Sequence, residues 1–125
     1  METIIKQQQN IKFRAVTIAD LDSIVKLYLK QKSIFDSALT NQFGMPLCVA
    51  EWNNKIVGYS SVTTTNTENY NLNTHIDSYF SNNKIDESLL EESEPFFKKE
   101  WQNGSNKNLS ISITHLVDWL NNSNS

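Results

Sequence analysis

Hydrophobic and polar residues alternate over the first apolar segment of the chain and then follow a helical period. The segment Ile11 to Ala15 has the period of two that is typical of a half-buried strand. Thr17 and, three residues later, Asp20 form a variant of the capping box that begins a helix. Apolar residues then recur at the spacing of one buried helix face, at Leu21, Ile24, Val25 and Tyr28. The pattern therefore predicts a strand followed directly by an amphipathic helix.

Two β-rich segments in the middle of the chain predict a hairpin. Leu47 to Glu51 and Lys55 to Val62 are rich in strand-forming residues. Asn53 and Asn54, which lie between them, accept the positive φ that a two-residue turn requires, although less readily than Asn-Gly. Gly58 inside the second segment predicts a bulge or a close approach of another group to the backbone.

The remaining segments have weaker patterns, which still divide into helices, strands and loops. In chain order they predict a short helix over Ser33 to Thr40, a break over Asn41 to Pro46, a loop over Thr63 to Asn73, a strand over Thr74 to Phe80, a break over Ser81 to Lys84, a helix from Asp86 to Trp101, a polar loop over Gln102 to Asn108, a strand over Leu109 to Ile113 and a last helix from Thr114 to Leu120. Pro95 is expected to kink the long helix or to divide it in two. One domain of 125 residues is expected, with flexible ends over 1–10 and 122–125.

Composition and charge argue against several classes of function. A formal charge of −3 and a pI near 5.3 do not fit a nucleic-acid footprint, which needs a clustered basic face. No apolar stretch approaches the roughly 18 residues of a membrane span, and the polar start has no signal-peptide pattern, so a cytoplasmic protein is expected. Cys48, the single cysteine, lies in an apolar run and is expected in the core. His75 and His115 are far apart in the chain, and no metal site is expected.

The order of elements resembles that of the GNAT family of N-acetyltransferases, and two local patterns add to it. Ile11 to Ala15, followed by Asp20, looks like the first strand and helix start of that family. Leu47 to Tyr59, with the pair Val57-Gly58, looks like its second and third strands. The resemblance covers the first half of the chain. It implies an α/β (α+β) fold with a mixed, mostly antiparallel sheet flanked by helices, in which the C-terminal strands of the family are truncated.

The family resemblance also implies acetyl-coenzyme A as cofactor. In GNAT enzymes the fourth strand leads through a glycine-rich turn into a helix, and backbone N–H groups of this turn bind the pyrophosphate. By position, this turn corresponds to Asn82, Asn83, Lys84 and Ile85, whose backbone is the candidate cofactor site. The turn has no glycine, and Asp86 adds a negative charge beside it. The sequence therefore departs from the family where the cofactor would bind.

Acetyl transfer to an amine needs a base for the amine and often a tyrosine as acid for the departing thiolate. His75, Asp77 and Tyr79 are expected on one face of the predicted fourth strand, so His75 and Tyr79 are candidate catalytic residues. The alternative is an exposed polar face on an edge strand. Glu51 is a further candidate base, with a cross-strand charge pair to Lys55 as its alternative role.

Two functions of different classes follow from these observations. The first is an acetyl-coenzyme A-dependent N-acetyltransferase-like domain that acts on a small-molecule or protein amine. The second is a non-catalytic GNAT-like module that binds a ligand or a protein and has lost the pyrophosphate loop. A third interpretation is an unrelated small α+β protein. A truncated sheet would leave an open edge, which a second copy of the chain could cover in a homodimer.

Overall fold

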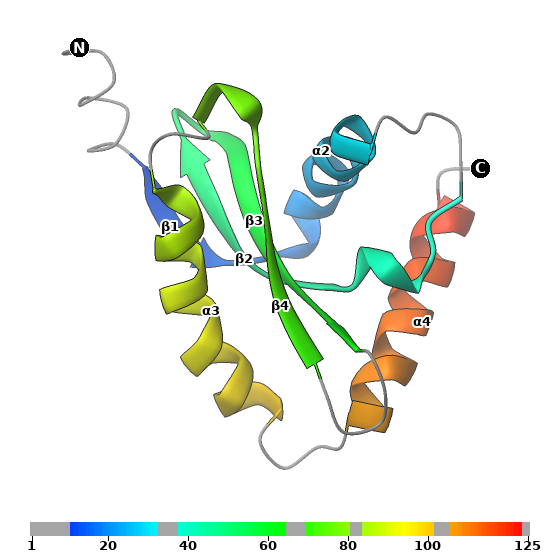
Figure 1. Ribbon diagram of the computed structural model, residues 1–125. Helices are drawn as coiled ribbons and strands as arrows, with labels where there is room; N and C mark the ends of the chain where they lie inside the picture. The colour runs from blue at the N-terminus through cyan, green and yellow to red at the C-terminus, as the bar shows by residue number, and fades with distance from the viewer. Residues whose placement is uncertain (1–10, 33–37, 65–69, 81–83, 102–105, 124–125) are drawn as a thin grey trace, which may run out of the picture.

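Among the residues that the structure describes, four strands form one antiparallel sheet with helices on both faces (Figure 1). The computed structural model describes residues 11–32, 38–64, 70–80, 84–101 and 106–123. In chain order the strands and α-helices are β1 (Lys12–Ala15), α2 (Leu21–Lys32), β2 (Met45–Trp52), β3 (Lys55–Thr64), β4 (Tyr70–Ile76), α3 (Ile85–Trp101) and α4 (Asn106–Ser123). Three single 3₁₀ turns accompany them, namely η1 (Ile18–Asp20), η2 (Asn41–Phe43) and η3 (Ser78–Phe80). The predicted fold class is confirmed.

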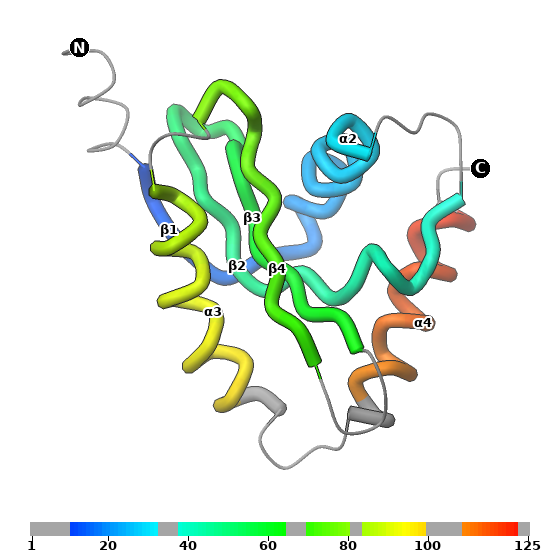
Figure 2. Tube along the Cα trace, viewed as in Figure 1, coloured from blue at the N-terminus to red at the C-terminus, as the bar shows by residue number. Residues whose placement is uncertain are grey.

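The sheet has the simplest possible strand order, β1-β2-β3-β4, in which β1 and β4 are the edges. Helix α3 covers one face, and α2 and α4 cover the other (Figure 1). Residues 38–44, which lead into β2, pass beside α4 (Figure 2). The side chain of Asn121 holds this segment by accepting from the Leu39 backbone N–H at 2.8 Å and donating to its carbonyl at 3.1 Å. No described helix is long and apolar enough to cross a membrane.

The predicted strand and capped helix at the start of the chain are confirmed. β1 pairs with β2 in the register Lys12–Glu51 to Ala15–Cys48. Asp20 closes the capping box by accepting from the Thr17 backbone N–H at 2.8 Å, and α2 follows it directly. Helix α2 buries the apolar face that the spacing predicted, at Leu21, Ile24, Val25, Leu27 and Tyr28.

The predicted hairpin is confirmed, and Gly58 fulfils both of its predicted roles. Asn53 and Asn54 have φ values of 52° and 64°, as a two-residue turn of this handedness requires. The register passes from Ala50–Gly58 to Glu51–Ile56, which leaves an extra residue on β3 as a bulge. A Cβ atom at Gly58 would lie 2.8 Å from Cδ1 of Ile76, so β4 also approaches this backbone closely. Cys48 is buried in the core, as predicted.

The predicted boundaries of the fourth strand are wrong. β3 continues to Thr64 and β4 begins at Tyr70, so much of the predicted loop over 63–73 is strand, and its centre, 65–69, lies outside the described residues. β4 ends at Ile76 rather than Phe80 because Asp77 begins a turn. The carbonyl of Asp77 accepts from the Phe80 N–H at 2.8 Å, and its Oδ1 accepts from the Tyr79 N–H at 3.0 Å.

The C-terminal part of the chain also differs from the prediction. The segment 109–113 is not a strand but part of α4, where the buried residues Leu109, Ile113, Val117 and Leu120 recur at helical spacing. Thr114, the predicted start of the last helix, lies inside α4, and its hydroxyl donates to the Ser110 carbonyl at 3.0 Å. Pro95 lies within α3 and does not divide it.

The short helix predicted over 33–40 is not seen where the chain is described. Residues 33–37 lie outside the described part, and residues 38–40 have no helical structure. In place of the predicted break, Asn41–Phe43 forms η2, and Gly44 then follows with a φ of 77°. A Cβ atom at Gly44 would lie only 2.6 Å from the Val62 carbonyl oxygen, so this turn packs tightly against β3.

Candidate functional site

A cleft of about 660 Å³ lies over β3 and β4, on the face of the sheet that α2 covers. Its lining comes from α2 (Tyr28, Lys32), η2 (Asn41, Gln42), β3 (Thr63, Thr64) and β4 (residues 72–75). The described side chains of this lining are mostly amides and hydroxyls, with one cation and no carboxylate among them. The volume lies within the range of about 300–1,000 Å³ that is typical of small-molecule sites.

The register of β3 and β4 explains why polar side chains gather beneath this cleft. Tyr59 pairs with His75, and Ser61 pairs with Asn73, so all four side chains lie on the same face of the sheet. The Nδ2 of Asn73 donates to Oγ1 of Thr63 at 3.2 Å, which joins the two strands on that face. The cleft therefore has a floor made of β3 and β4 and walls made of α2 and η2.

His75 is held between two tyrosine rings. Its imidazole stacks on Tyr59, with 4.8 Å between ring centroids, and meets Tyr28 nearly edge-on at 5.7 Å. Nδ1 lies 3.3 Å from Oε1 of Gln31, whose Nε2 donates to the Ile76 carbonyl. Because Oε1 can only accept, this geometry assigns the proton to Nδ1 and leaves Nε2 as an acceptor. Burial lowers the pKa of His75, and the charge of Lys32 lowers it further, so the ring is neutral near pH 7.

Two hydroxyl groups in the same layer have no hydrogen-bond partner in the described part of the chain. They are Oη of Tyr59 and Oγ of Ser61, whose residues are 0 % and 1 % exposed. Burial raises the pKa of the Tyr59 phenol, so the group stays protonated and able to donate. A buried hydroxyl without a partner costs on the order of 1–3 kcal/mol. This face of the sheet therefore carries buried polar groups that no hydrogen bond among the described residues satisfies.

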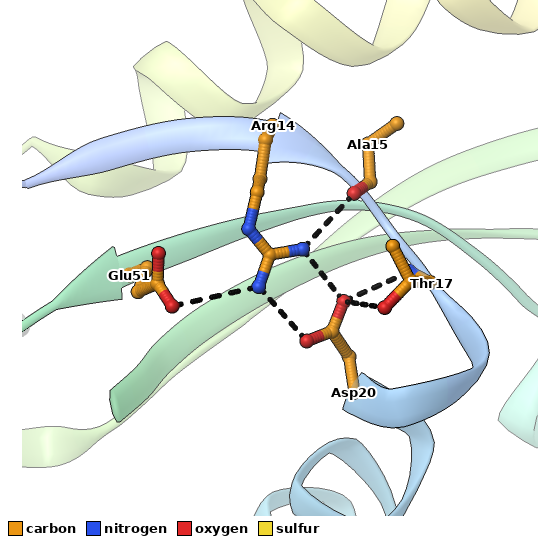
Figure 3. A network of polar contacts seen from close by, with 5 residues as sticks. All are labelled: Arg14, Ala15, Thr17, Asp20 and Glu51. Atoms are coloured by element: carbon orange, nitrogen blue, oxygen red, sulfur yellow. Dashed lines mark hydrogen bonds and ion pairs between the residues drawn. The ribbon is translucent and has the colours of Figure 1, made fainter. Parts of the chain in front are cut away.

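A second polar cluster lies at the other edge of the sheet and is fully bonded (Figure 3). The Arg14 guanidinium donates to both oxygens of Asp20, at 2.7 Å and 2.9 Å, in a bidentate pair. Thr17 donates to the same carboxylate through its backbone N–H and its hydroxyl, the latter at 3.0 Å. The hydrogen bonds from Arg14, together with those from Thr17, lower the pKa of Asp20 to about 2. This cluster positions α2, which forms one wall of the cleft.

The structure does not bring the three predicted catalytic residues together. His75 lines the cleft, Tyr79 lies on η3 and is 72 % exposed, and Glu51 belongs to the hairpin end of β2. The expectation that His75, Asp77 and Tyr79 share a strand face is wrong, because β4 ends before Asp77. Their catalytic roles stay predictions.

Glu51 lies within ion-pair distance of a cation other than the one predicted. Its Oε2 lies 3.5 Å from Nη2 of Arg14 (Figure 3). Lys55 pairs with Trp52 in the hairpin register, because the bulge shifts Glu51 opposite Ile56. The alternative role of Glu51, a charge pair with Lys55, is therefore wrong. Within the described part of the chain, no group of three or more His, Cys, Asp or Glu side chains could hold a metal ion.

Comparison with known proteins identifies the fold. No protein-family model and no curated protein matches the chain. Solved structures do match, among them two of the aminoglycoside acetyltransferase meta-AAC0020 from an uncultured soil metagenomic sample, in complex with trehalose and with sisomicin. Each has a TM-score of 0.54 and 14 % sequence identity, and the match covers 74 % of this chain and 72 % of that chain. The chain has an acetyltransferase fold. Membership of the GNAT family itself stays a prediction.

The described end of the candidate cofactor turn, Lys84 and Ile85, has little that would favour the pyrophosphate of acetyl-coenzyme A. Asn82 and Asn83 lie outside the described residues; Lys84 is exposed with a φ of 56°, and Ile85 is buried in the first turn of α3. Asp86 and Glu87 occupy the same first turn, where they already offset the helix dipole. A pyrophosphate there would meet two carboxylates and no glycine.

Sequence reasoning missed most of the cleft, although one signal was present. Leu72, Thr74 and Ile76 alternate with Asn71, Asn73 and His75. This period of two marks a strand that begins before Thr74, and it places Asn73 on the face of His75. No sequence pattern indicated that Lys32 lines the cleft, because a basic residue in the last turn of a helix is common.

Proposed function

We propose that this chain is a non-catalytic GNAT-like domain that binds a small polar molecule in the cleft over β3 and β4. The observation that carries the proposal is the polar cleft itself, and the face of the sheet beneath it also carries two buried hydroxyls, outside the lining, without a partner among the described residues. Groups of this kind are normally satisfied by a ligand or by ordered water. The likeness of fold is in keeping with a small-molecule ligand, because the similar structures are of an enzyme in complex with trehalose and with sisomicin.

Loss of the cofactor site is the reason for placing binding before catalysis. A diphosphate needs approachable backbone N–H groups and positive potential. The first turn of α3 instead carries Asp86 and Glu87, and the segment from Asp77 to Asp86 has no glycine. Lys84 is the single cation of that segment. These features favour a domain that has kept the fold but not the acetyl donor.

Acetyl transfer from acetyl-coenzyme A to an amine is the second candidate function. It is favoured by the fold of the relatives, which include an enzyme solved in complex with the aminoglycoside sisomicin. His75 would serve as the base, because its ring is neutral and Nε2 is the acceptor. Tyr79 and Glu51 remain further candidates, although neither lines the cleft.

Isothermal titration of the full chain separates the two candidates. We expect no saturable binding of acetyl-coenzyme A or free coenzyme A at millimolar concentration. Micromolar binding of acetyl-coenzyme A would overturn the non-catalytic proposal and favour the second candidate, and amines would then be screened for transfer. Trehalose and sisomicin, the molecules bound in the solved relatives, serve as the first polar probes of the cleft.

A matched pair of variants tests whether a probe binds in the cleft. Asn73→Leu removes an amide from the floor of the cleft, whereas Asn71→Leu makes the same change two residues earlier on β4, at an exposed position outside the lining. We expect Asn73→Leu to weaken probe binding at least threefold and Asn71→Leu to leave it unchanged. Equal effects of the two variants, or no binding of either probe, would contradict the proposed site.

A further inference from the structure

We infer that the cleft selects a hydroxyl-rich ligand that is neutral or carries a carboxylate, and that Lys32 excludes cationic amines. The inference rests on the proposed binding function and adds the chemical class of the ligand. It goes against the expectation that comes from the fold, since the solved relatives are acetyltransferases of aminoglycosides, which are cationic amines.

The described lining of the cleft carries charge of one sign. Among the described residues Lys32 is the only charged one in this lining, and Nζ lies 5.9 Å from the ring centroid of Tyr28, over a wall of the cleft. Within the described part of the chain no carboxylate lies within ion-pair distance of this ammonium group. Its field reaches the floor, because its charge is one of the two causes that lower the pKa of His75. A protonated amine in the cleft would therefore meet a like charge and no counterion from the described residues of its lining.

The hydrogen-bonding groups of the floor suit hydroxyl groups. Asn73 uses Nδ2 to donate to Thr63 Oγ1 and to the Asn71 carbonyl, which leaves its Oδ1 as an acceptor. Thr63 accepts that bond and keeps its own O–H as a donor. His75 contributes the acceptor Nε2, since Nδ1–H faces Gln31. Donors and acceptors thus alternate over a short distance, which a polyol matches because each hydroxyl both donates and accepts.

Three sugars that differ in one group test this inference. Glucose, glucuronate and glucosamine share the pyranose ring, and at a pH where the amine is protonated they carry charges of zero, minus one and plus one. Chemical-shift titration of the full chain gives a dissociation constant for each. We expect the order glucuronate, then glucose, then glucosamine, with roughly three- to tenfold between the first and the last, because one partly solvated charge pair is worth about that much.

Two variants in α2 test whether Lys32 causes this order of sugar affinities. Lys32→Gln should bring the constants for glucuronate and glucosamine to within twofold of each other. Lys30→Gln makes the same change in the same helical turn, but Lys30 lines a different pocket, so the order of the three sugars should persist. Lys32→Glu should reverse the order.

Three results would overturn the inference. They are glucosamine binding as tightly as glucuronate, an order of affinities that Lys32→Gln leaves unchanged, and failure of all three sugars to bind. The proposed function fails in a different way, namely if neither the sugars nor trehalose nor sisomicin binds in the cleft. If sisomicin binds in a manner that depends on Asn73 and none of the three sugars binds, the proposed function holds and only the ligand class is wrong, because it is then the cationic one.

Discussion

The two polar clusters of this sheet differ in how far their hydrogen bonds are satisfied. At the β1 edge, the Asp20 carboxylate accepts from Arg14 and from Thr17, and Glu51 lies beside the same guanidinium (Figure 3). Near the β4 edge, the hydroxyls of Tyr59 and Ser61 are buried without a partner in the described residues. The first cluster is complete within the fold and serves stability. The second is incomplete and leaves bonding capacity for a ligand or for water.

The largest expected effect concerns the complete cluster. Arg14→Ala removes the counterion of Asp20, whose side chain is 8 % exposed, and leaves a buried charge without its partner. Because the Arg14 side chain itself is 36 % exposed, we expect the free energy of unfolding to fall by about 2–3 kcal/mol, below the range for fully buried pairs. Urea denaturation followed by circular dichroism measures this loss.

The control for Arg14→Ala is a surface ion pair on α2, the helix that follows Asp20. Nζ of Lys26 lies 3.1 Å from Oδ2 of Asp22, and the two side chains are 76 % and 73 % exposed. Lys26→Ala should change the free energy of unfolding by less than about 0.5 kcal/mol. If Arg14→Ala lowers the free energy of unfolding as little as Lys26→Ala does, the cluster of Arg14 and Asp20 does not stabilise the fold.

The pH dependence of stability gives a second view of the same cluster. Asp20 has a pKa of about 2 in the folded chain against an ordinary 3.8, so its contribution is fully present above pH 3.8 and is lost as the pH falls towards 2. The difference between these pKa values corresponds to roughly 2 kcal/mol. In acid titrations of stability, the Asp20→Asn variant should show a shallower decline over this interval. An unchanged slope would mean that the Asp20 carboxylate titrates normally.

The third prediction concerns the pKa of His75 in the cleft. Because burial and Lys32 lower the pKa of His75, its contribution to stability is present above the ordinary value of 6.5 and is lost as the pH falls below it. NMR titration of the imidazole should give a pKa below 6.5 in the wild-type chain and a value closer to 6.5 in Lys32→Gln. Burial, the larger cause, remains in that variant, so the return should be incomplete. A wild-type pKa at or above 6.5 would contradict the neutral ring on which the site is built.

The secondary structure around the complete cluster could be predicted from the sequence, because its signals are local, but the ion pair of Arg14 with Asp20 was not predicted. The alternation over Ile11 to Ala15 and the spacing of Thr17 and Asp20 predicted the strand and the capped helix start, and Asn53-Asn54 predicted the hairpin turn. Each of these features depends on neighbours within a few residues. The partner of Glu51 was missed because it depends on a bulge in the β2–β3 register and on the pairing of β1 with β2.

The cleft could not be predicted from the sequence, because the segments that line it come together only through long-range pairing. α2 supplies Lys32, η2 supplies Asn41, and β4 supplies His75, and no local pattern links these segments. Leu109 to Ile113 was misassigned because apolar residues at every second position of a five-residue segment also include the i, i+4 spacing of a helix. Packing of Leu109 and Ile113 against the sheet, together with Val117 further along, decides in favour of the helix.

The smallest expected effect is the sharpest test of the contrast, because it compares neighbouring serines on β3 that face opposite sides of the sheet. Ser60 Oγ accepts from the Cys48 N–H at 3.1 Å and bonds with Ser93, so Ser60→Ala should cost about 1–2 kcal/mol in the free energy of unfolding. Ser61 Oγ has no partner in the described chain, so Ser61→Ala should be neutral or stabilise by up to about 1 kcal/mol. Both serines are at most 1 % exposed, so the difference in unfolding free energy between the two variants measures hydrogen bonding rather than burial. If Ser61→Ala destabilises as much as Ser60→Ala, the hydroxyl of Ser61 has a partner in the folded protein, and the contrast between the two clusters then rests on the hydroxyl of Tyr59 alone.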